Sequence, residues 1–348
     1  MGLLYFAFSF LLTFVAMPAV IRLAEWKQLF DLPDGRKVHR DHISALGGIA
    51  MFGTMLVSSF TFLDMAHFTE FRNFLAAYVL IFLLGVLDDL RQASYWLKLI
   101  VQVSAALVLV IPGELCFTSF QGLFSVFEIS HTLGSIFTVA FIILVINAFN
   151  FIDGIDGLAG MLGFLILTFF ALWFYSAGFD SWKAMSVFMA GSLLAFLAYN
   201  RPPARIFMGD SGSLSTGFVI AGAAIAFIEG NIRPDVPLRL MSAPAVAFSV
   251  MAIPLFDTLR LILLRIIRGR SPFSPDQAHI HHILLRRGWS HHAVLVLLGG
   301  YTLLLVALNL YLDLKGLGVN YLMALDFVLT GLFYGLLVLR KDRSPSAT

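Results

Sequence analysis

Long apolar stretches alternate with short polar segments along the whole chain. Stretches of about 17–25 apolar residues can cross a bilayer as α-helices. The chain contains about eleven, near residues 3–23, 46–63, 73–90, 96–112, 132–150, 157–176, 183–199, 212–228, 243–264, 293–312 and 319–339. The pattern predicts an all-α, polytopic integral membrane protein with about eleven transmembrane helices. For the segment 113–131 it leaves open a short interfacial piece in place of a plain turn.

The composition supports this prediction and excludes a pair of soluble domains. Hydrophobic residues make up 59% of the chain and charged residues 13%, with a mean hydropathy of +0.89. Soluble domains are nearer 25% charged, so we expect a single transmembrane domain over residues 1–348. The first stretch lacks a basic leader and is longer than a signal-peptide core. We therefore expect it to be retained as a helix.

The single cysteine and the small net charge exclude two further classes of protein. Cys116 alone cannot form an internal disulfide, so no disulfide framework supports the fold. The formal charge of +2 is too small to indicate nucleic acid. We expect a lipid bilayer as the surroundings and no nucleic-acid partner.

The distribution of Lys and Arg predicts the orientation of the chain in the membrane. Basic residues gather in cytoplasmic loops, and the first long loop, 24–45, is taken as the inside. Of the 23 Lys and Arg residues, 18 then lie in loops or helix ends on the inner side of the membrane. The five on the outer side are Arg72, Lys183, Arg233, Arg239 and Lys315. This bias predicts a periplasmic N-terminus and a cytoplasmic C-terminus. The predicted active-site loops lie on the inside, near residues 24–45, 88–96, 150–157, 200–212 and 265–292.

Four polar side chains follow one another at intervals of three residues near the end of the fifth stretch. They are Asn147, Asn150, Asp153 and Asp156, and adjacent members share a helix face. Such a string at the end of a membrane helix is costly and marks a functional site. Oxygen ligands suit a hard cation such as Mg²⁺. The alternative is an Asn/Asp helix cap followed by a glycine turn.

Asp88 and Asp89 end the third stretch, and Lys98 lies at the start of the next one. The helix macrodipole disfavours negative charge at a helix C-terminus, so a cation or a substrate should compensate the two carboxylates. Lys98 is placed to meet an anionic group. The alternatives are solvated carboxylates and a lysine that merely extends to the interface.

The segment Gly209–Ser213, Gly-Asp-Ser-Gly-Ser, opens the eighth stretch. Backbone N–H groups at a helix start bind phosphate, but Asp210 would repel phosphate unless a metal ion bridges the two. An N-cap aspartate is the alternative. The presence of the Asn/Asp string favours the metal site.

Three histidines, His279, His281 and His282, follow a Ser-Pro-Phe-Ser-Pro segment at 271–275, with Arg265 a little upstream. Zinc binding is one interpretation, but no cysteine or fourth histidine lies at a useful spacing. Recognition of phosphate or sugar is favoured over zinc and over histidines without a role.

Arg36, Lys37 and His39 follow a turn in the first long loop. They either satisfy the positive-inside bias or hold a lipid phosphate. Asp326 lies within the last apolar stretch, and no function is assigned to it from the sequence.

Together these strings resemble the polyprenyl-phosphate N-acetylhexosamine-1-phosphate transferase superfamily, glycosyltransferase family 4. Ile146–Asn150, Asp153–Gly157, Ser271–Asp276 and His279–His282 are similar to one branch of it. This branch is the bacterial undecaprenyl-phosphate N-acetylglucosamine-1-phosphate transferases, which start O-antigen and enterobacterial common antigen chains. The resemblance covers residues 31 to about 290, with five separate motifs in family order.

The resemblance implies a fold, a reaction and a location. The fold has eleven helices, and the active site faces the cytoplasm at the bacterial inner membrane. The donor is UDP-N-acetylglucosamine, the acceptor is undecaprenyl phosphate, and the products are UMP and undecaprenyl-diphospho-N-acetylglucosamine. The implied cofactor is Mg²⁺, with Mn²⁺ as a substitute, and a homodimer is left open.

The resemblance also implies roles for individual residues. Asp210 and Asn150 hold the metal ion against the pyrophosphate. Asp88 and Asp89 position or deprotonate the acceptor phosphate, and Lys98 neutralises it. The implied substrate contacts are Asn147, Asp153, Asp156, Arg265, His279, His281, His282, Arg36, Lys37 and His39, with Asp153 and Asp156 also counted as catalytic. Since a phosphate monoester with a second pKa near 6 is already largely ionised, Asp88 and Asp89 are expected mainly to position it.

Two alternatives to this reaction stay open. A transferase of phospho-N-acetylmuramoyl-pentapeptide resembles the chain, but those relatives tend to carry three consecutive histidines in place of His279-Ile-His-His. A cation-coupled transporter also places carboxylates in membrane helices. It should hold them near the bilayer midplane, often within inverted repeats, whereas here they lie at predicted helix ends.

Overall fold

The computed structural model describes residues 1–27, 43–63, 65–269 and 278–339. Within these ranges the chain is helical, apart from its loops and one isolated antiparallel bridge between Ser119 and Glu128. The helices are α1 Gly2–Lys27, α2 Gly47–Phe62, α3 Met65–Arg91, α4 Tyr95–Val110, α5 His131–Ile152, α6 Leu158–Ala177, α7 Asp180–Asn200, α8 Gly209–Gly230, α9 Ala243–Val250, α10 Ala252–Ile267, α11 Ile280–Arg286, α12 His291–Leu314 and α13 Val319–Leu339, with a 3-10 turn η1 at Leu123–Ser125.

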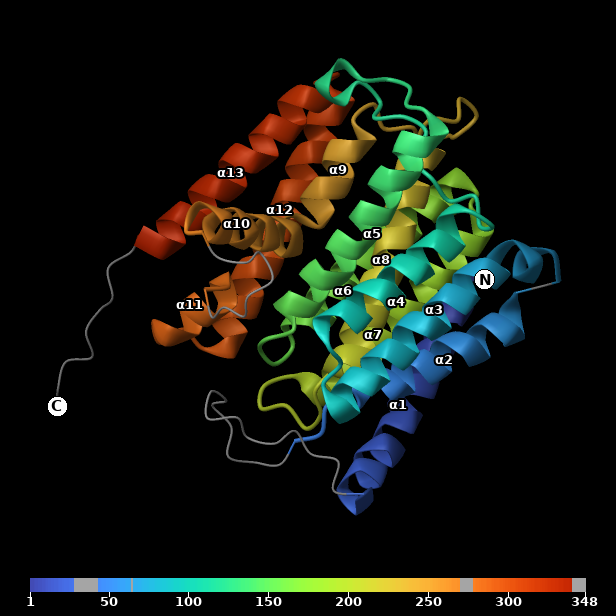
Figure 1. Ribbon diagram of the computed structural model, residues 1–348, viewed down its shortest axis with the longest axis vertical. Coiled ribbons are helices and arrows are strands. Elements are labelled where there is room, and N and C mark those ends of the chain that lie inside the picture. Colours follow the sequence, from blue (N-terminus) through green and yellow to red (C-terminus); the bar gives the residue numbers. More distant parts are fainter. Residues whose placement is uncertain (28–42, 64, 270–277, 340–348) are drawn as a thin grey trace.

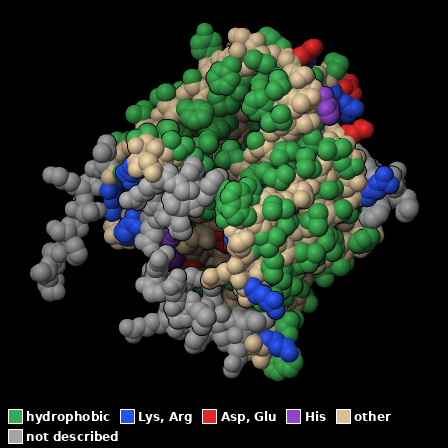
Figure 2. All heavy atoms as spheres, in the orientation of Figure 1, with side chains coloured by type: hydrophobic (Ala, Val, Ile, Leu, Met, Phe, Trp, Pro, Cys, Tyr) green, Lys and Arg blue, Asp and Glu red, His purple; other side chains and the backbone are tan. Residues whose placement is uncertain are grey.

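The helices confirm an all-α, polytopic membrane protein. Eight of those described are long and apolar enough to cross a membrane, namely α1, α3, α5, α6, α7, α8, α12 and α13. The apolar helices α2 and α4 are shorter, at 16 residues each. Hydrophobic side chains gather over the upper and right-hand parts of the face in Figure 2, as a lipid environment favours. Eleven crossings and the orientation of the two termini stay predictions.

One predicted span, 243–264, is divided into two helices. Helix α9 ends at Val250 and α10 begins at Ala252, with Met251 between them in a non-helical conformation. Pro254 explains the break, because it lacks the N–H that would bond to the carbonyl of Val250 and its ring crowds that carbonyl. Helix α10 then runs across the direction of α9 (Figure 1) and packs against α5 and α13.

Helix α8 forms the centre of the bundle. Every residue in its most apolar 18-residue window is buried, and α2, α3, α5, α6 and α7 surround it. Small residues allow the backbones to approach closely. A Cβ added at Gly48 on α2 would lie 2.2 Å from the backbone N of Gly212, and one at Gly85 on α3 would lie 2.4 Å from Cα of Ser211. These contacts fix the start of α8 against two neighbouring helices.

The segment 113–131, for which the sequence left open an interfacial piece or a plain turn, folds at the opposite end of the molecule from the site loops. It contains the 3-10 turn and the single bridge. Glu229, at the end of α8, accepts hydrogen bonds from the N–H and hydroxyl of Thr118. Asn320, on α13, donates to the carbonyl of Gly122 at 2.8 Å. The segment therefore joins the central bundle to the C-terminal helices.

Candidate active site

The described residues of the predicted polar loops come together at one end of the bundle. The ends of α3 and α5 and the starts of α4 and α8 lie at the lower end of Figure 1, with α11 beside them. Figure 2 shows a recess in this region, with acidic and histidine side chains in its floor.

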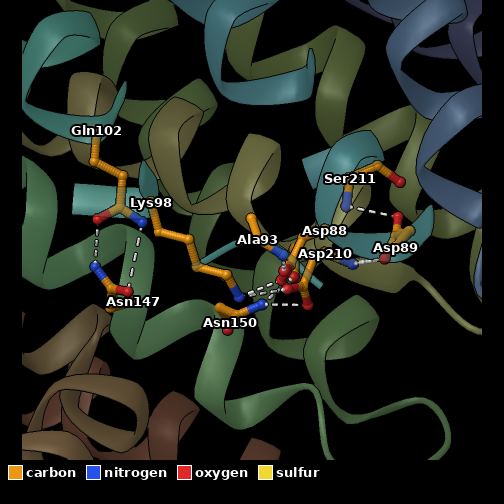
Figure 3. Close-up of polar contacts among 10 residues, drawn as sticks. Asp88, Asp89, Ala93, Lys98, Gln102, Asn147, Asn150, Asp210 and Ser211 are labelled. Atoms are coloured by element: carbon orange, nitrogen blue, oxygen red, sulfur yellow. Dashed lines mark hydrogen bonds and ion pairs between the residues drawn. The ribbon is translucent and has the colours of Figure 1, made fainter. Parts of the chain in front are cut away.

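Lys98 joins two aspartates that lie far apart in the sequence. Its Nζ donates to Oδ2 of Asp88 and lies 3.3 Å from Oδ2 of Asp210, and the three side chains converge in Figure 3. The backbone N–H of Ala93 donates to Oδ1 of Asp88 at 2.7 Å. The hydroxyl of Ser94 caps the start of α4, which fixes the turn that carries Lys98. The carboxylates at the end of α3 thus have a compensating cation within the protein.

Asp89 has a different position from its neighbour. Its Oδ1 accepts from the backbone N–H of Asp210 at 2.7 Å, and its Oδ2 accepts from that of Ser211 at 3.0 Å. A carboxylate at a helix N-terminus satisfies otherwise unpaired N–H groups and interacts favourably with the helix dipole. Asp89 therefore holds the start of α8, and with it Asp210, in place.

Of the two asparagines on α5, only Asn150 joins the carboxylates. Its side-chain amide donates to Oδ1 of Asp210 at 2.9 Å and to the hydroxyl of Ser213 at 2.8 Å. Asn147 lies one turn earlier and donates to Oε1 of Gln102 at 2.8 Å, apart from the carboxylates in Figure 3. Gln102, buried on α4, and Ser213 were not predicted as site residues. A buried glutamine in an apolar helix is the signal that could have identified the first.

Asp153 ends α5 and is the most electrostatically disfavoured carboxylate of the site loops. Burial raises the pKa of Asp153 to about 8, and the negative charges of Asp210, Asp89 and Asp156 add to the effect. Without a compensating cation, this carboxyl group therefore holds a proton at neutral pH.

Asp156 stabilises the loop between α7 and α8. It is 4% exposed, its Oδ2 accepts from the backbone N–H of Ala204 at 3.1 Å, and Nδ1 of His291 lies 3.8 Å from the same oxygen. The next residue, Gly157, has a φ of +81° and donates its N–H to Oδ1 of Asn200 at 2.8 Å. The structure thus places Asp156 within the scaffold of the loop.

His281 packs against the loop that follows α5. It is fully buried, and a Cβ added at Gly154 would lie 2.2 Å from its Nε2. Burial, together with the charges of His282 and His279, holds the pKa of His281 well below its usual value, so the ring is neutral. The glycine is required because any side chain there would overlap the imidazole. His282 is partly buried, and burial and the charge of His279 lower its pKa as well.

His279 is held by a residue that sequence reasoning missed. Its Nδ1 lies 2.7 Å from Oδ2 of Asp257 on α10, and Nη2 of Arg260 lies 2.9 Å from Oδ1 of the same carboxylate. An Asp and an Arg three residues apart inside an apolar stretch were a usable signal. Arg265, one turn beyond on α10, is 5% exposed.

Some predicted site residues lie outside the described residues. They are Arg36, Lys37 and His39 in the first loop, together with the segment 271–276 before the histidines.

The carboxylates fit a divalent cation of the kind that binds substrate phosphates. The described residues contain no group of three or more His, Cys, Asp or Glu side chains that closes around a metal ion. Mg²⁺ rarely uses such a cage, because one or two carboxylates and the phosphates of the substrate complete its octahedron. Asp210 and Asp88 supply two such carboxylates beside one another, with Nδ2 of Asn150 2.9 Å from Oδ1 of Asp210 and Nζ of Lys98 3.3 Å from its Oδ2. The residues present therefore suit Mg²⁺ at this position.

Comparison with families of known proteins identifies residues 71–228 as matching the model of glycosyl transferase family 4. This range contains Asp88, Asp89, Lys98, Asn150 and Asp210. It therefore covers every member of the carboxylate cluster.

Several known transferases are similar to this chain over most of their length. A probable undecaprenyl-phosphate N-acetylglucosaminyl 1-phosphate transferase of Bacillus subtilis is 33% identical over 299 residues, which cover 84% of this chain and 80% of the relative. The undecaprenyl-phosphate alpha-N-acetylglucosaminyl 1-phosphate transferase of Yersinia pestis is 30% identical over 97% of this chain and 90% of its own. A decaprenyl-phosphate N-acetylglucosaminephosphotransferase of Mycobacterium leprae is 31% identical, with coverages of 83% and 78%.

Proposed function

This chain belongs to glycosyl transferase family 4, and from that premise we propose that it transfers N-acetylglucosamine 1-phosphate from UDP-N-acetylglucosamine to undecaprenyl phosphate. The products are UMP and undecaprenyl-diphospho-N-acetylglucosamine. The observation that carries the proposal is the Asp88–Lys98–Asp210 cluster, with Asn150 against Asp210. It combines a metal-compatible carboxylate with a lysine, and the reaction brings two phosphates together.

The main obstacle to the reaction is repulsion between two anions. An oxygen of the acceptor phosphate attacks the β-phosphorus of the donor, a new P–O bond forms, and the bond to UMP breaks with its electron pair on UMP. Two unit charges 4 Å apart repel by about 4 kcal/mol at an effective dielectric near 20. A Mg²⁺ ion held by Asp210 and Asn150 would neutralise the pyrophosphate and the departing UMP. Mn²⁺ is proposed as a substitute.

The other residues of the site are proposed to have separate roles in substrate binding and positioning. Lys98 carries the positive charge that meets the acceptor phosphate, and Asp88 holds its ammonium in place. Asp89 orients the start of α8, so that Asp210 keeps its position. His279 and His281 lie next to the α5–α6 side of the site, and with His282 they are proposed to meet the donor.

The proposed location follows from the loop charges. Eighteen of the 23 Lys and Arg residues fall on the side of the site loops, and only the other five fall on the opposite side. This bias supports a site at the cytoplasmic face of the inner membrane. The product then begins a lipid-linked surface glycan.

A transfer assay tests the proposal. Purified protein in nanodiscs is given undecaprenyl phosphate, Mg²⁺ and UDP-N-acetylglucosamine labelled in the sugar, and labelled lipid is counted. EDTA should abolish the label, and Mg²⁺ or Mn²⁺ should restore it. Label that enters lipid only from UDP-N-acetylmuramoyl-pentapeptide would reassign the donor, and label from neither sugar would contradict the transferase.

A further inference from the structure

Gln102 is a polar residue in an otherwise apolar part of α4. It is 2% exposed, and it lies one helical turn after Lys98, on the same face of the helix. A buried side-chain amide is costly in an apolar environment unless its donors and its acceptor are paired. The partner of Gln102 therefore indicates why the chain places a glutamine there.

This partner is Asn147 on α5. Nδ2 of Asn147 donates to Oε1 of Gln102 at 2.8 Å, and Nε2 of Gln102 lies 3.5 Å from Oδ1 of Asn147. Nδ2 of Asn147 also donates to the carbonyl of Ile143 at 2.7 Å, and because a carbonyl only accepts, this contact fixes which way the amide is turned. The two side chains thus form a reciprocal amide pair between α4 and α5.

The amide pair lies one turn away from the carboxylate cluster on both helices. Lys98 precedes Gln102 on α4, and Asn150 follows Asn147 on α5. Lys98 meets Oδ2 of Asp210, and Asn150 meets Oδ1 of the same carboxylate. Figure 3 shows the amide pair to one side of these contacts, with the side chain of Lys98 extending from α4 towards Asn150. Helices α4 and α5 are therefore joined by the amide pair and, one turn away, through Asp210.

Apolar contact alone selects the orientation of α4 only weakly. In a bilayer, lipid tails are as apolar as the side chains that they replace, so no hydrophobic force holds one helix against another. One side of α4 is exposed, at Trp96, Ile100 and Leu107. A side-chain hydrogen bond is directional, so the amide pair selects one rotation and one height of α4 against α5. Lys98 is carried on α4 and takes its position from that register.

We propose that Gln102 is a positioning residue for the acceptor: paired with Asn147, it fixes the register of α4 so that Lys98 meets the acceptor phosphate beside Asp210. The inference rests on the proposed function, which supplies the acceptor and the role of Lys98. It gives Asn147 a different role from the substrate contact that the family resemblance implied, because both N–H groups of its side chain are already used, by Gln102 and by Ile143. In this role neither amide touches the reacting phosphates.

Exchanging the two amides tests the inference. Gln102→Asn and Asn147→Gln each change the combined length of the pair by one methylene, and the double variant restores that length and both amides. Transfer is measured in mixed micelles, in which the mole fraction of undecaprenyl phosphate and the concentration of UDP-N-acetylglucosamine are varied separately. Each single variant should lower kcat/KM for undecaprenyl phosphate roughly 10- to 100-fold, because a displacement of about 1 Å can cost that much. The double variant should recover to within about threefold of the wild type.

Gln102→Leu separates positioning from stability. Leucine fills the space of the glutamine without its amide, so kcat/KM for the acceptor should fall as in the single variants. Its melting temperature should stay close to that of the wild type, since an interhelical hydrogen bond contributes little stability in a membrane. KM for UDP-N-acetylglucosamine should change less than about twofold, because the donor does not depend on Lys98.

Asn309→Leu is the matched control. Nδ2 of Asn309, which is buried on α12, donates to Oδ1 of Asp326 on α13 at 2.6 Å, so the variant also removes an interhelical hydrogen bond of a side-chain amide. It should leave kcat/KM for the acceptor unchanged, whatever its effect on melting temperature.

Three outcomes would count against one proposal or the other. A double variant no more active than the weaker single variant, or a Gln102→Leu protein with the acceptor kcat/KM of the wild type, would overturn the inference. A parallel rise in KM for both substrates would make the amide pair merely structural and overturn it as well. Wild-type protein that transfers no sugar phosphate to undecaprenyl phosphate would instead contradict the proposed function.

Discussion

Two adjacent aspartates, Asp88 and Asp89, have different partners and therefore different roles. Asp88 is paired with Lys98, whereas Asp89 receives two backbone N–H groups at the start of α8. From the sequence, the two residues were assigned together to the acceptor phosphate. Nothing in two consecutive carboxylates reveals that α8, some 120 residues later, begins next to the second one.

Asp88→Asn and Asp89→Asn should separate these roles. An amide at position 88 loses the ion pair with Lys98, and we expect turnover to fall roughly 10- to 100-fold with little change in melting temperature. An amide at position 89 can accept with only one oxygen and loses its charge, so we expect about 1 kcal/mol of lost stability. Thermal unfolding and the transfer assay on both variants measure the two effects. Equal losses of turnover and of stability in the two variants would contradict separate roles for Asp88 and Asp89.

Asp153 should make the stability of the protein depend on pH. Folding raises the pKa of Asp153 from its ordinary 3.8 to about 8. The folded chain therefore retains a proton that the unfolded chain releases. The loss of stability grows as pH rises from about 4 to about 8 and is constant above that.

Asp153→Asn removes this penalty. In EDTA, its melting temperature should exceed that of the wild type by more at pH 8 than at pH 5. Differential scanning fluorimetry across this range makes the measurement. A difference that is constant with pH would show that Asp153 ionises normally in the folded chain.

At the scale of the helices, close backbone contact around α8 is what fixes the site. Gly48 on α2 faces Gly212 so closely that a Cβ would overlap its backbone N, whereas an added Cβ at Gly53, on the same helix, meets nothing within 4 Å. The two glycines lie five residues apart and provide a matched pair.

Gly48→Ala should push α2 away from the start of α8, and Gly53→Ala should not. We expect several degrees of lost melting temperature and a marked loss of transfer activity in Gly48→Ala, because Asp210 moves with α8. Gly53→Ala should equal the wild type or be slightly more stable, since alanine favours the helix by about 1 kcal/mol. Equal effects of the two substitutions would show that the α2–α8 contact is unimportant.

The sequence predicts these helices better than it predicts their packing. Length and hydropathy locate each apolar stretch, because a membrane helix satisfies its own backbone hydrogen bonds. The break at Met251 was missed because Pro254 was treated as part of one apolar stretch, although proline in a helix interior often interrupts it. The pairing of Asp257 with His279 depends on that break and so could not be predicted from local patterns.

At the scale of the whole molecule, the C-terminal ends of α1, α3, α5 and α7 lie at the same end. This agrees with the predicted topology, in which successive loops lie on alternate sides of the membrane. The composition of the site loops identified their chemistry, since Asp, Asn and Lys at helix ends are costly without a function. Their individual partners depend on contacts across the sequence, as those of Asp156 and Asn147 show.

The topology predicts where reagents can reach the chain. A cysteine introduced at Arg91, near the site loops, should react with a membrane-impermeant maleimide only after cells are opened, in a Cys116→Ser background. A cysteine introduced at Lys315, between α12 and α13, should react in intact spheroplasts. The reverse pattern would invert the orientation and move the site to the other face of the membrane.

The central position of α8 has a consequence for how the protein is made. Its neighbours α2, α3, α5, α6 and α7 all precede it in the chain, and α9 follows. The ribosome therefore synthesises these five neighbouring helices before it synthesises α8. Because Asp210 stands at the start of that helix, a nascent chain receives this carboxylate only after the helices that carry Asp88, Lys98 and Asn150 have been synthesised.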